Sequence, residues 1–132
     1  MVGFIPERIE GSYIPPWEYI PASAIQPKIG MALYLSSGKL AIATGTTKPE
    51  FISMGEYGAA VTAGTPIPVI RVNDEIVFKT SNSASLSGVN VGARVTLHAS
   101  SGMQVTGTTS SGVAEIVAKS GDESGSDVLV RF

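Results

Sequence analysis

Short alternations of apolar and polar residues run through most of this chain, and they predict β-strands. Residues 30–35 and 39–43 alternate on either side of a Ser-Ser-Gly turn, where glycine supplies the positive φ of a tight reversal. No stretch keeps a 3.6-residue apolar period over three turns, so no helix is predicted. Short strands between Gly, Ser and Thr turns are typical of an all-β fold, as a compact barrel or sandwich. Strands are predicted at 30–35, 39–43, 51–54, 67–72, 75–79, 93–97, 103–106, 113–118 and 128–132.

The alternating pattern occurs twice along the chain. Residues 29–47 align with residues 91–109 at an offset of 62 (91 − 29), and residues 67–72 align with 127–132 at an offset of 60 (127 − 67). A repeat at fixed spacing indicates a repeated structural unit. The matching positions include Gly30 with Gly92, Leu35 with Leu97, and Thr44-Gly45-Thr46-Thr47 with Thr106-Gly107-Thr108-Thr109.

We therefore predict one β domain at 29–132, built from two tandem copies of a short-strand unit at 29–72 and 90–132. A linker at 73–89 joins the copies. Apolar alternation and turn chemistry repeat, whereas no reactive side chain does, and this favours a scaffold. Pro66 and Pro68 predict that the strand at 67–72 begins at a sheet edge, because proline cannot donate to a ladder.

Residues 1–28 have a different composition and predict an extended, Pro-rich N-terminal arm. They hold five of the eight prolines, which disfavour long helices and interior strands. They also hold the large apolar side chains that disordered segments lack. Such residues anchor protein interfaces, and whether the arm docks on its own domain, a sister subunit or another partner stays open. The candidate partner-binding residues are Phe4, Ile5, Tyr13, Ile14, Trp17, Tyr19 and Ile20.

Charge and composition narrow the function classes. The net charge is −2 and the nine basic residues are scattered, so nucleic acid is a poor partner. No apolar run reaches the roughly 18 residues of a membrane span, so no membrane partner is expected. The chain has no cysteine, which excludes disulfide and thiol chemistry. Its first residues lack a signal-peptide pattern, and production in a cytoplasm is expected.

Candidate chemistry is sparse, and we predict neither an enzyme nor a cofactor or metal site. His98 is the only histidine, and its counterpart in the other copy is a serine, so general-base work is not favoured. The acidic segment 121–127 could hold a cation, but its spacing fails the EF-hand register. Asp74-Glu75 and Glu7/Glu10 give no distinct pair of catalytic carboxylates. Serine and threonine runs lack a nucleophile motif.

The pattern of the first copy resembles the small β-rich head decoration (cement) proteins of tailed bacteriophages and prophages, the lambda-type decoration proteins. The resemblance is carried by a Pro-rich lead-in and by residues 29–72, and more weakly by 90–132 through the repeat. The quoted segments are Gly30 to Leu40, Thr44 to Pro49, Gly58 to Gly64 and Ile67 to Val72. The duplicated unit and the aromatic arm depart from the family pattern.

The resemblance implies a non-enzymatic structural protein of the virion, assembled in the host cytoplasm. Such proteins sit on the outer capsid surface, often as homotrimers, and clamp subunits of the major capsid protein lattice. A second reading of the residues is a ligand- or carbohydrate-binding β module on a virion or cell surface. Body aromatics such as Tyr34 and Phe51 lie in strand-like positions that suggest core, which favours the first reading.

Overall fold

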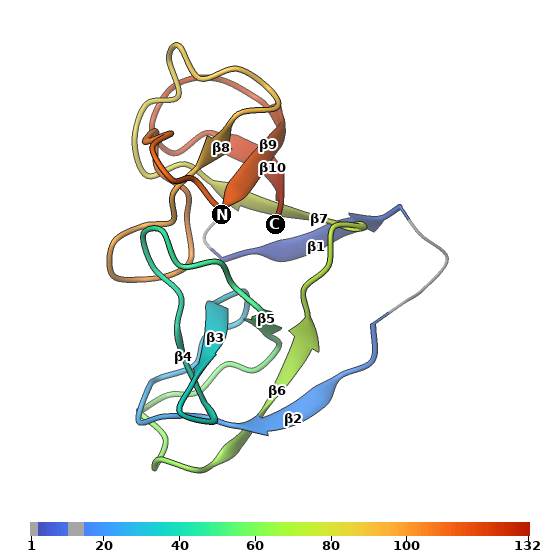
Figure 1. Ribbon diagram of the computed structural model, residues 1–132, viewed down its shortest axis with the longest axis vertical. Helices are drawn as coiled ribbons and strands as arrows, with labels where there is room; N and C mark the ends of the chain where they lie inside the picture. The colour runs from blue at the N-terminus through green and yellow to red at the C-terminus, as the bar shows by residue number, and fades with distance from the viewer. Residues whose placement is uncertain (1–2, 11–14) are drawn as a thin grey trace.

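The protein is an all-β sandwich in the computed structural model, which describes residues 3–10 and 15–132 (Figure 1). Within that part of the chain there is no helix, and ten strands form two antiparallel five-stranded sheets. The predicted fold class is confirmed. The strands are β1 (Ile5–Ile9), β2 (Glu18–Pro21), β3 (Ala32–Ser36), β4 (Lys39–Ile42), β5 (Phe51–Ser53), β6 (Pro66–Arg71), β7 (Ile76–Ser81), β8 (Arg94–Val95), β9 (Ala114–Lys119) and β10 (Asp127–Arg131).

Each copy of the sequence repeat supplies most of one sheet. Sheet A has the order β1-β7-β10-β9-β8, and sheet B has the order β2-β6-β5-β3-β4. The run β10-β9-β8 from the second copy thus matches the run β6-β5-β3 from the first. In Figure 1 the two sheets occupy the upper and lower halves of the molecule.

The structural equivalence extends further towards the N-terminus than the sequence repeat indicates. Just after β2, the Ala22 amide donates to the Thr65 carbonyl at 2.9 Å. Sixty residues later (82 − 22), just after β7, the Asn82 amide donates to the Ser126 carbonyl at 3.1 Å. Strands β2 and β7 therefore hold equivalent places beside β6 and β10. The two halves run from 18 to 72 and from 78 to 132, and β7 comes from the segment 73–89.

The edge position predicted from Pro66 and Pro68 is wrong, because β6 lies between β2 and β5. The prolines are tolerated inside the sheet because Pro68 only needs to accept on the β5 side. Its carbonyl receives the Met54 amide at 2.9 Å. Ladder bonding towards β2 is left to Ile67 and Val69, which keep their N–H groups.

The strand predicted at 103–106 is also wrong in extent. Only Val105 makes isolated bridges there, to Asn82 and to Leu97. The carbonyl of Met103 accepts instead from the Gly3 amide at 2.8 Å and from the Thr80 hydroxyl at 2.7 Å. The Gln104 carbonyl still accepts the His98 amide at 2.8 Å and the Thr106 amide donates to the Thr96 carbonyl at 2.9 Å. The hairpin pairing is therefore kept around Val105, and it ends at Met103, whose carbonyl is bound by Gly3 and Thr80.

The main core lies between the sheets and includes Phe4, Ile52, Ile70, Phe78 and Phe132. A second cluster is built on the opposite face of sheet B from Leu33, Leu40, Phe51, Ile67 and Val69. Side chains alternate between the faces of a strand, so β6 directs Ile70 into the main core and Ile67 into the second cluster. Sheet B is therefore covered by apolar residues on both faces.

Candidate interaction surface

The structure divides the seven candidate arm residues into three groups. Phe4, Ile5 and Ile20 pack into the chain's own domain, as buried or half-buried residues. Trp17 and Tyr19 are 58% and 67% exposed. Tyr13 and Ile14 lie outside the described residues. The described parts of the segment 1–28 thus contribute one edge strand to each sheet. Of the candidate residues that the structure describes, Trp17 and Tyr19 are the two whose side chains are exposed enough to contact another molecule.

Phe4 belongs to the core. Its side chain has no exposed area, and its ring meets the Phe132 ring edge-on with a centroid distance of 5.1 Å. The Phe4 amide donates to the Gly30 carbonyl at 2.7 Å. Directly afterwards β1 pairs with β7, with Ile5 opposite Lys79. A partner cannot reach Phe4 without unfolding the start of the chain.

Trp17 and Tyr19 lie together at the outer edge of sheet B. Residues two apart in an extended segment share a face, so both side chains project from one side of β2 and its lead-in. Tyr19 stands opposite Pro68, on the same face as Ile70, but beyond the area that sheet A covers. Ile20, on the other face, packs against the second cluster. This alternation exposes two aromatic rings while the strand itself stays anchored.

The Glu18–Arg71 pair holds the edge strand to its neighbour. The Arg71 guanidinium donates from Nε to Glu18 Oε2 at 3.2 Å and from its NH2 nitrogen to Oε1 at 2.9 Å. Arg71 also lies over the Phe51 ring, at 4.9 Å from its centroid. A bidentate carboxylate pair fixes orientation as well as distance, so β2 is positioned by side chains in addition to its ladder with β6.

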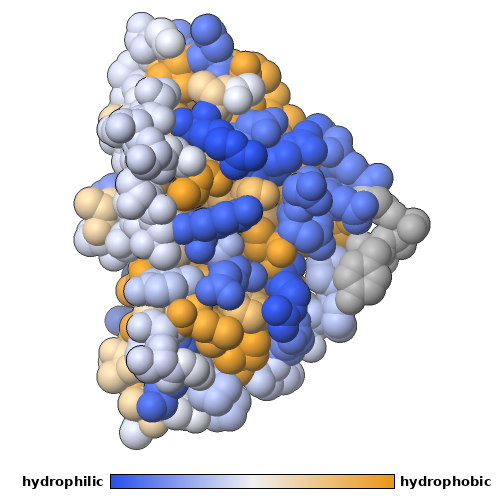
Figure 2. Space-filling model, viewed as in Figure 1, coloured by the Kyte–Doolittle hydropathy of each residue, from blue (hydrophilic) through white to orange (hydrophobic). Residues whose placement is uncertain are grey.

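Other exposed apolar residues of the described chain do not form a comparable pair. Ile29, Leu35 and Val91 are 44%, 40% and 58% exposed, and they come from separate loops and strands. Figure 2 shows hydrophobic areas separated by hydrophilic residues on one face of the molecule. Aromatic side chains are enriched at the centres of protein interfaces. Trp17 and Tyr19 are therefore the best candidates for a binding surface.

His98 has a structural role. Its Nδ1 accepts the Ser101 amide at 3.2 Å and lies 3.0 Å from the Ser101 hydroxyl. The Ser100 amide points to the same nitrogen at 3.4 Å. These contacts hold the imidazole ring of His98 in the turn that contains Ser100 and Ser101.

The acidic turn is bound to the protein by a lysine. The Lys119 ammonium contacts Asp122 Oδ1 at 2.6 Å, the Val89 carbonyl at 2.7 Å and the Leu86 carbonyl at 3.4 Å. Asp122 is thus already paired with a cation of the chain itself. Among residues 3–10 and 15–132, no group of three or more metal-ligating side chains comes together.

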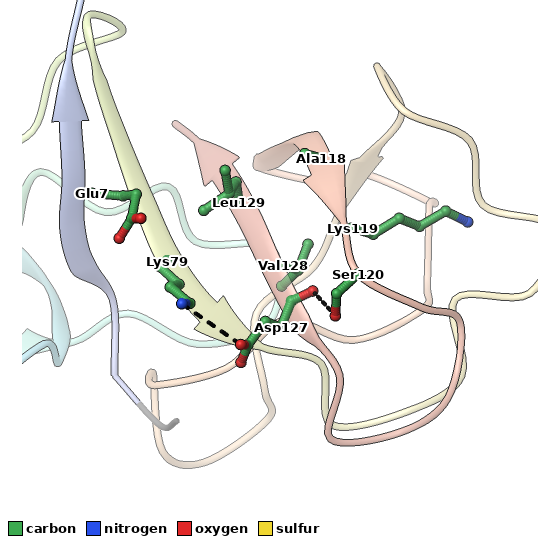
Figure 3. Close-up of a pocket in the computed structure, with 8 residues that line it drawn as sticks. All are labelled: Glu7, Lys79, Ala118, Lys119, Ser120, Asp127, Val128 and Leu129. Carbon is green, nitrogen blue, oxygen red and sulfur yellow. Dashed lines mark hydrogen bonds and ion pairs between the residues drawn. The ribbon is translucent and has the colours of Figure 1, made fainter.

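The outer face of sheet A carries a hollow of about 330 Å³, shown in Figure 3. Lys79 and Asp127 point towards each other across it at 3.6 Å, while the Lys119 side chain extends away from them. The Ser120 hydroxyl donates to the Asp127 carbonyl at 3.1 Å. Glu10, one of the carboxylates singled out in the sequence, pairs with Arg131 at 2.9 Å. Two carboxylates, Glu7 and Asp127, line the hollow, and Asp127 is paired with Lys79.

Sequence reasoning identified Trp17 and Tyr19 but missed that they stand at an open sheet edge. The only signal was the offset of 60 between the copies. Continued towards the N-terminus, this offset aligns residue 18 with residue 78 in the sequence. No helix of the described chain is long and apolar enough to cross a membrane. No family model, curated protein or solved structure matches the chain.

Proposed function

We propose that this protein is a structural decoration (cement) protein of a tailed-phage head, which binds the outer capsid surface and stabilises the lattice. The observation that carries the proposal is the exposed pair Trp17 and Tyr19 on a strand anchored by Glu18 and Arg71. Rigid, exposed aromatic side chains suit a docking surface, because little conformational entropy is lost when they are covered. The resemblance of residues 29–72 supplies the identity of the partner.

The mechanism follows from linkage. A protein that binds only the expanded capsid lattice stabilises that lattice over its precursors by RT ln(1 + [L]/Kd), without doing chemistry. The partners are the major capsid protein and, on the capsid, further copies of this chain, for which the resemblance implies a trimer. The sandwich contributes a fixed shape that holds the aromatic pair in place.

The test is binding to expanded phage heads with point variants, because deleting residues 1–27 would remove β1, β2 and the core residue Phe4. We expect Trp17→Ala with Tyr19→Ala to lower capsid affinity by at least about tenfold, as for an interface hot spot. Val91→Ala is the matched control, since Val91 is equally exposed but distant in sequence. If no version of the folded protein binds heads or raises their heat resistance, the capsid proposal is wrong.

The same two rings favour a carbohydrate-binding module as the second candidate. Exposed aromatic faces contact the apolar faces of sugar rings, and Trp17 and Tyr19 project on one side of β2. Saturable binding to a defined glycan, lost in the Trp17→Ala variant, would favour this candidate. Binding to glycan-free capsids would favour the first.

A further inference from the structure

A hollow of about 530 Å³ lies where three distant segments of the chain meet. It is lined from the first half by Lys28, Ile29 and Glu56, from β1 by Ile5, and from the second half by residues between 98 and 104. Small-molecule sites have volumes of about 300–1,000 Å³ and combine apolar area with a few polar groups. The hollow has this composition, because Ile5, Ile29 and Met103 share it with charged and polar side chains.

Hydrogen bonds to a neighbouring segment fix the first wall of the hollow. The Tyr57 amide donates to the Pro27 carbonyl at 3.0 Å. One residue on along each segment, the Ile29 amide donates to Glu56 Oε1 at 3.0 Å. Lys28 stands between these two bonds. The segment that carries the lysine is therefore held on both sides, and the Oε2 atom of Glu56 remains available for a ligand.

The second wall is a turn with its own hydrogen bonds. The His98 amide donates to the Gln104 carbonyl at 2.8 Å, and the Gln104 Nε2 donates to the Ser81 hydroxyl at 2.9 Å. The His98 Nδ1 accepts the Ser101 amide at 3.2 Å. Because Nδ1 accepts a backbone N–H, Nε2 is the ring nitrogen that can donate to a ligand.

Residues 3 and 4 join the two walls. The Gly3 amide donates to the Met103 carbonyl at 2.8 Å, and the Phe4 amide donates to the Gly30 carbonyl at 2.7 Å. The crossing is tight, since a Cβ on Gly3 would lie 2.7 Å from the Ile29 carbonyl oxygen. The walls are thus fixed to each other by the chain itself. A preformed site loses less entropy when it binds a ligand.

Two opposite charges line the hollow without neutralising each other. Lys28 and Glu56 both lie on its first wall. Within residues 3–10 and 15–132, neither of them forms an ion pair. A ligand with a single charge would approach one side chain of opposite sign and one of its own sign. A ligand that carries both charges is complementary to both side chains.

The residues of the second wall are positions at which the two sequence copies differ. At the offset of 62, the first copy has other residue types in place of the histidine, serine, methionine and glutamine of this wall. The repeated β unit therefore forms with either set, and the fold does not require the second. That these differences gather at one hollow favours a ligand site. The residues of the second wall are His98, Ser101, Met103 and Gln104, and their counterparts are Ser36, Lys39, Ala41 and Ile42.

We propose that this hollow binds a free α-amino acid with an apolar side chain. The ligand carboxylate contacts the Lys28 ammonium and the His98 Nε2, while the ligand ammonium contacts Glu56 Oε2. Its side chain covers Ile29 and Met103. Charge-assisted hydrogen bonds orient such a ligand, and the burial of apolar area adds affinity. The proposal is independent of the capsid role, which concerns other residues.

Titration of the ¹⁵N-labelled full chain with L-leucine and L-phenylalanine, followed by amide NMR, is the first test. We expect saturable shifts at Ile29, His98 and Gln104. Three analogues each lack one feature: leucine amide the carboxylate, 4-methylpentanoate the ammonium, and glycine the side chain. Each is expected to bind at least about fivefold more weakly than leucine. No saturable shift with either amino acid, or equal binding by any analogue, overturns the proposal.

Charge-removing variants of the full chain are the second test. Glu56→Gln keeps an oxygen that accepts the Ile29 amide, so it removes the charge and retains the wall. Glu56→Gln and Lys28→Gln are each expected to weaken leucine binding at least about fivefold. The matched control is Lys39→Gln, at an exposed lysine on β4 that does not line the hollow. The amide spectrum of each variant shows that it is folded. Unchanged affinity in either hollow variant, or an equal loss in the control, overturns the proposal.

Discussion

Ser23 and Ser83 make the same two hydrogen bonds in opposite halves of the molecule. The Ser23 amide and hydroxyl donate to the Leu40 carbonyl at 2.9 and 2.7 Å. The Ser83 amide and hydroxyl donate to the Val105 carbonyl at 2.7 and 3.1 Å. Each serine thereby ties the end of one strand to a residue further along the chain, β2 to Leu40 of β4 and β7 to Val105. Small polar residues outside the sequence repeat thus make equivalent contacts that the apolar alternation does not predict.

We predict that Ser23→Ala and Ser83→Ala each lower the free energy of unfolding by about 1 kcal/mol, the usual net value of one such bond. Chemical denaturation followed by fluorescence measures both. The two losses are expected to be similar because the geometry is similar. A loss at one position with none at the other would show that the halves are not energetically equivalent.

Phe4→Ala is expected to lower the free energy of unfolding by about 3–5 kcal/mol, as for other buried phenylalanines. The reason is the loss of its contacts in the core with Phe132 and its neighbours. Trp17→Ala serves as the comparison and should change stability by no more than about 0.5 kcal/mol, because the ring is exposed. Thermal or denaturant unfolding checks both, and equal effects would contradict the assignment of Phe4 to the core.

Gly30→Ala should be more destabilising than Gly88→Ala. Both glycines have positive φ, +86° and +80°, where a side chain costs about 1–2 kcal/mol. At Gly88 an added Cβ meets no atom within 4 Å, whereas at Gly30 it would lie 2.6 Å from the Phe4 nitrogen. The additional clash is expected to cost about 1–3 kcal/mol. The difference in unfolding free energy between the two variants, measured by urea denaturation, gives the cost of this clash. Equal losses would contradict the close contact between position 30 and the Phe4 nitrogen.

Lys119→Met should destabilise the protein by about 1.5–3 kcal/mol, since the ammonium satisfies two backbone carbonyls and Asp122. Lys79→Met provides the control. Its ion pair with Asp127 is longer, at 3.6 Å, and more exposed, so a change within about 0.5 kcal/mol is expected. Guanidinium chloride is a salt and would screen these ion pairs, so the unfolding free energies are measured by urea denaturation. A neutral effect at Lys119 would show that water replaces its contacts without loss.

The alternation of apolar residues predicted the fold class because burial on one face of a strand has a period of two. The repeat between residues 29–72 and 90–132 indicated a repeated structural unit, and each copy supplies most of one sheet. The pairing of residues between the two halves could not be predicted from the sequence. Gly45 and Leu97 bridge the two units, and Thr and Gly in a loop carry no signal for such a partner. Only the structure shows that Pro68 can sit inside a sheet.

The arm was the hardest segment to interpret from sequence. Proline content and aromatic side chains suggested a strap, and they do not distinguish a strand at the edge of its own sheet from one on a neighbour. Phe4 and Trp17 look alike as anchors, yet one is fully buried and the other 58% exposed. Phe4 precedes β1, which pairs with β7, whereas Trp17 precedes β2, which pairs with β6. Both partner strands are distant from the arm in the sequence, so the difference in burial depends on long-range contacts.

The split between the sheets sets an order for folding during synthesis. Sheet B is assembled from residues 18–71, which leave the ribosome consecutively. Strand β1 of sheet A pairs with β7, so it has no strand partner until residues 76–81 have emerged. We expect a nascent chain ending near residue 100 to protect the amides of β5 and β6 from hydrogen exchange while those of β1 still exchange freely. Early protection of β1 would mean that it first docks elsewhere.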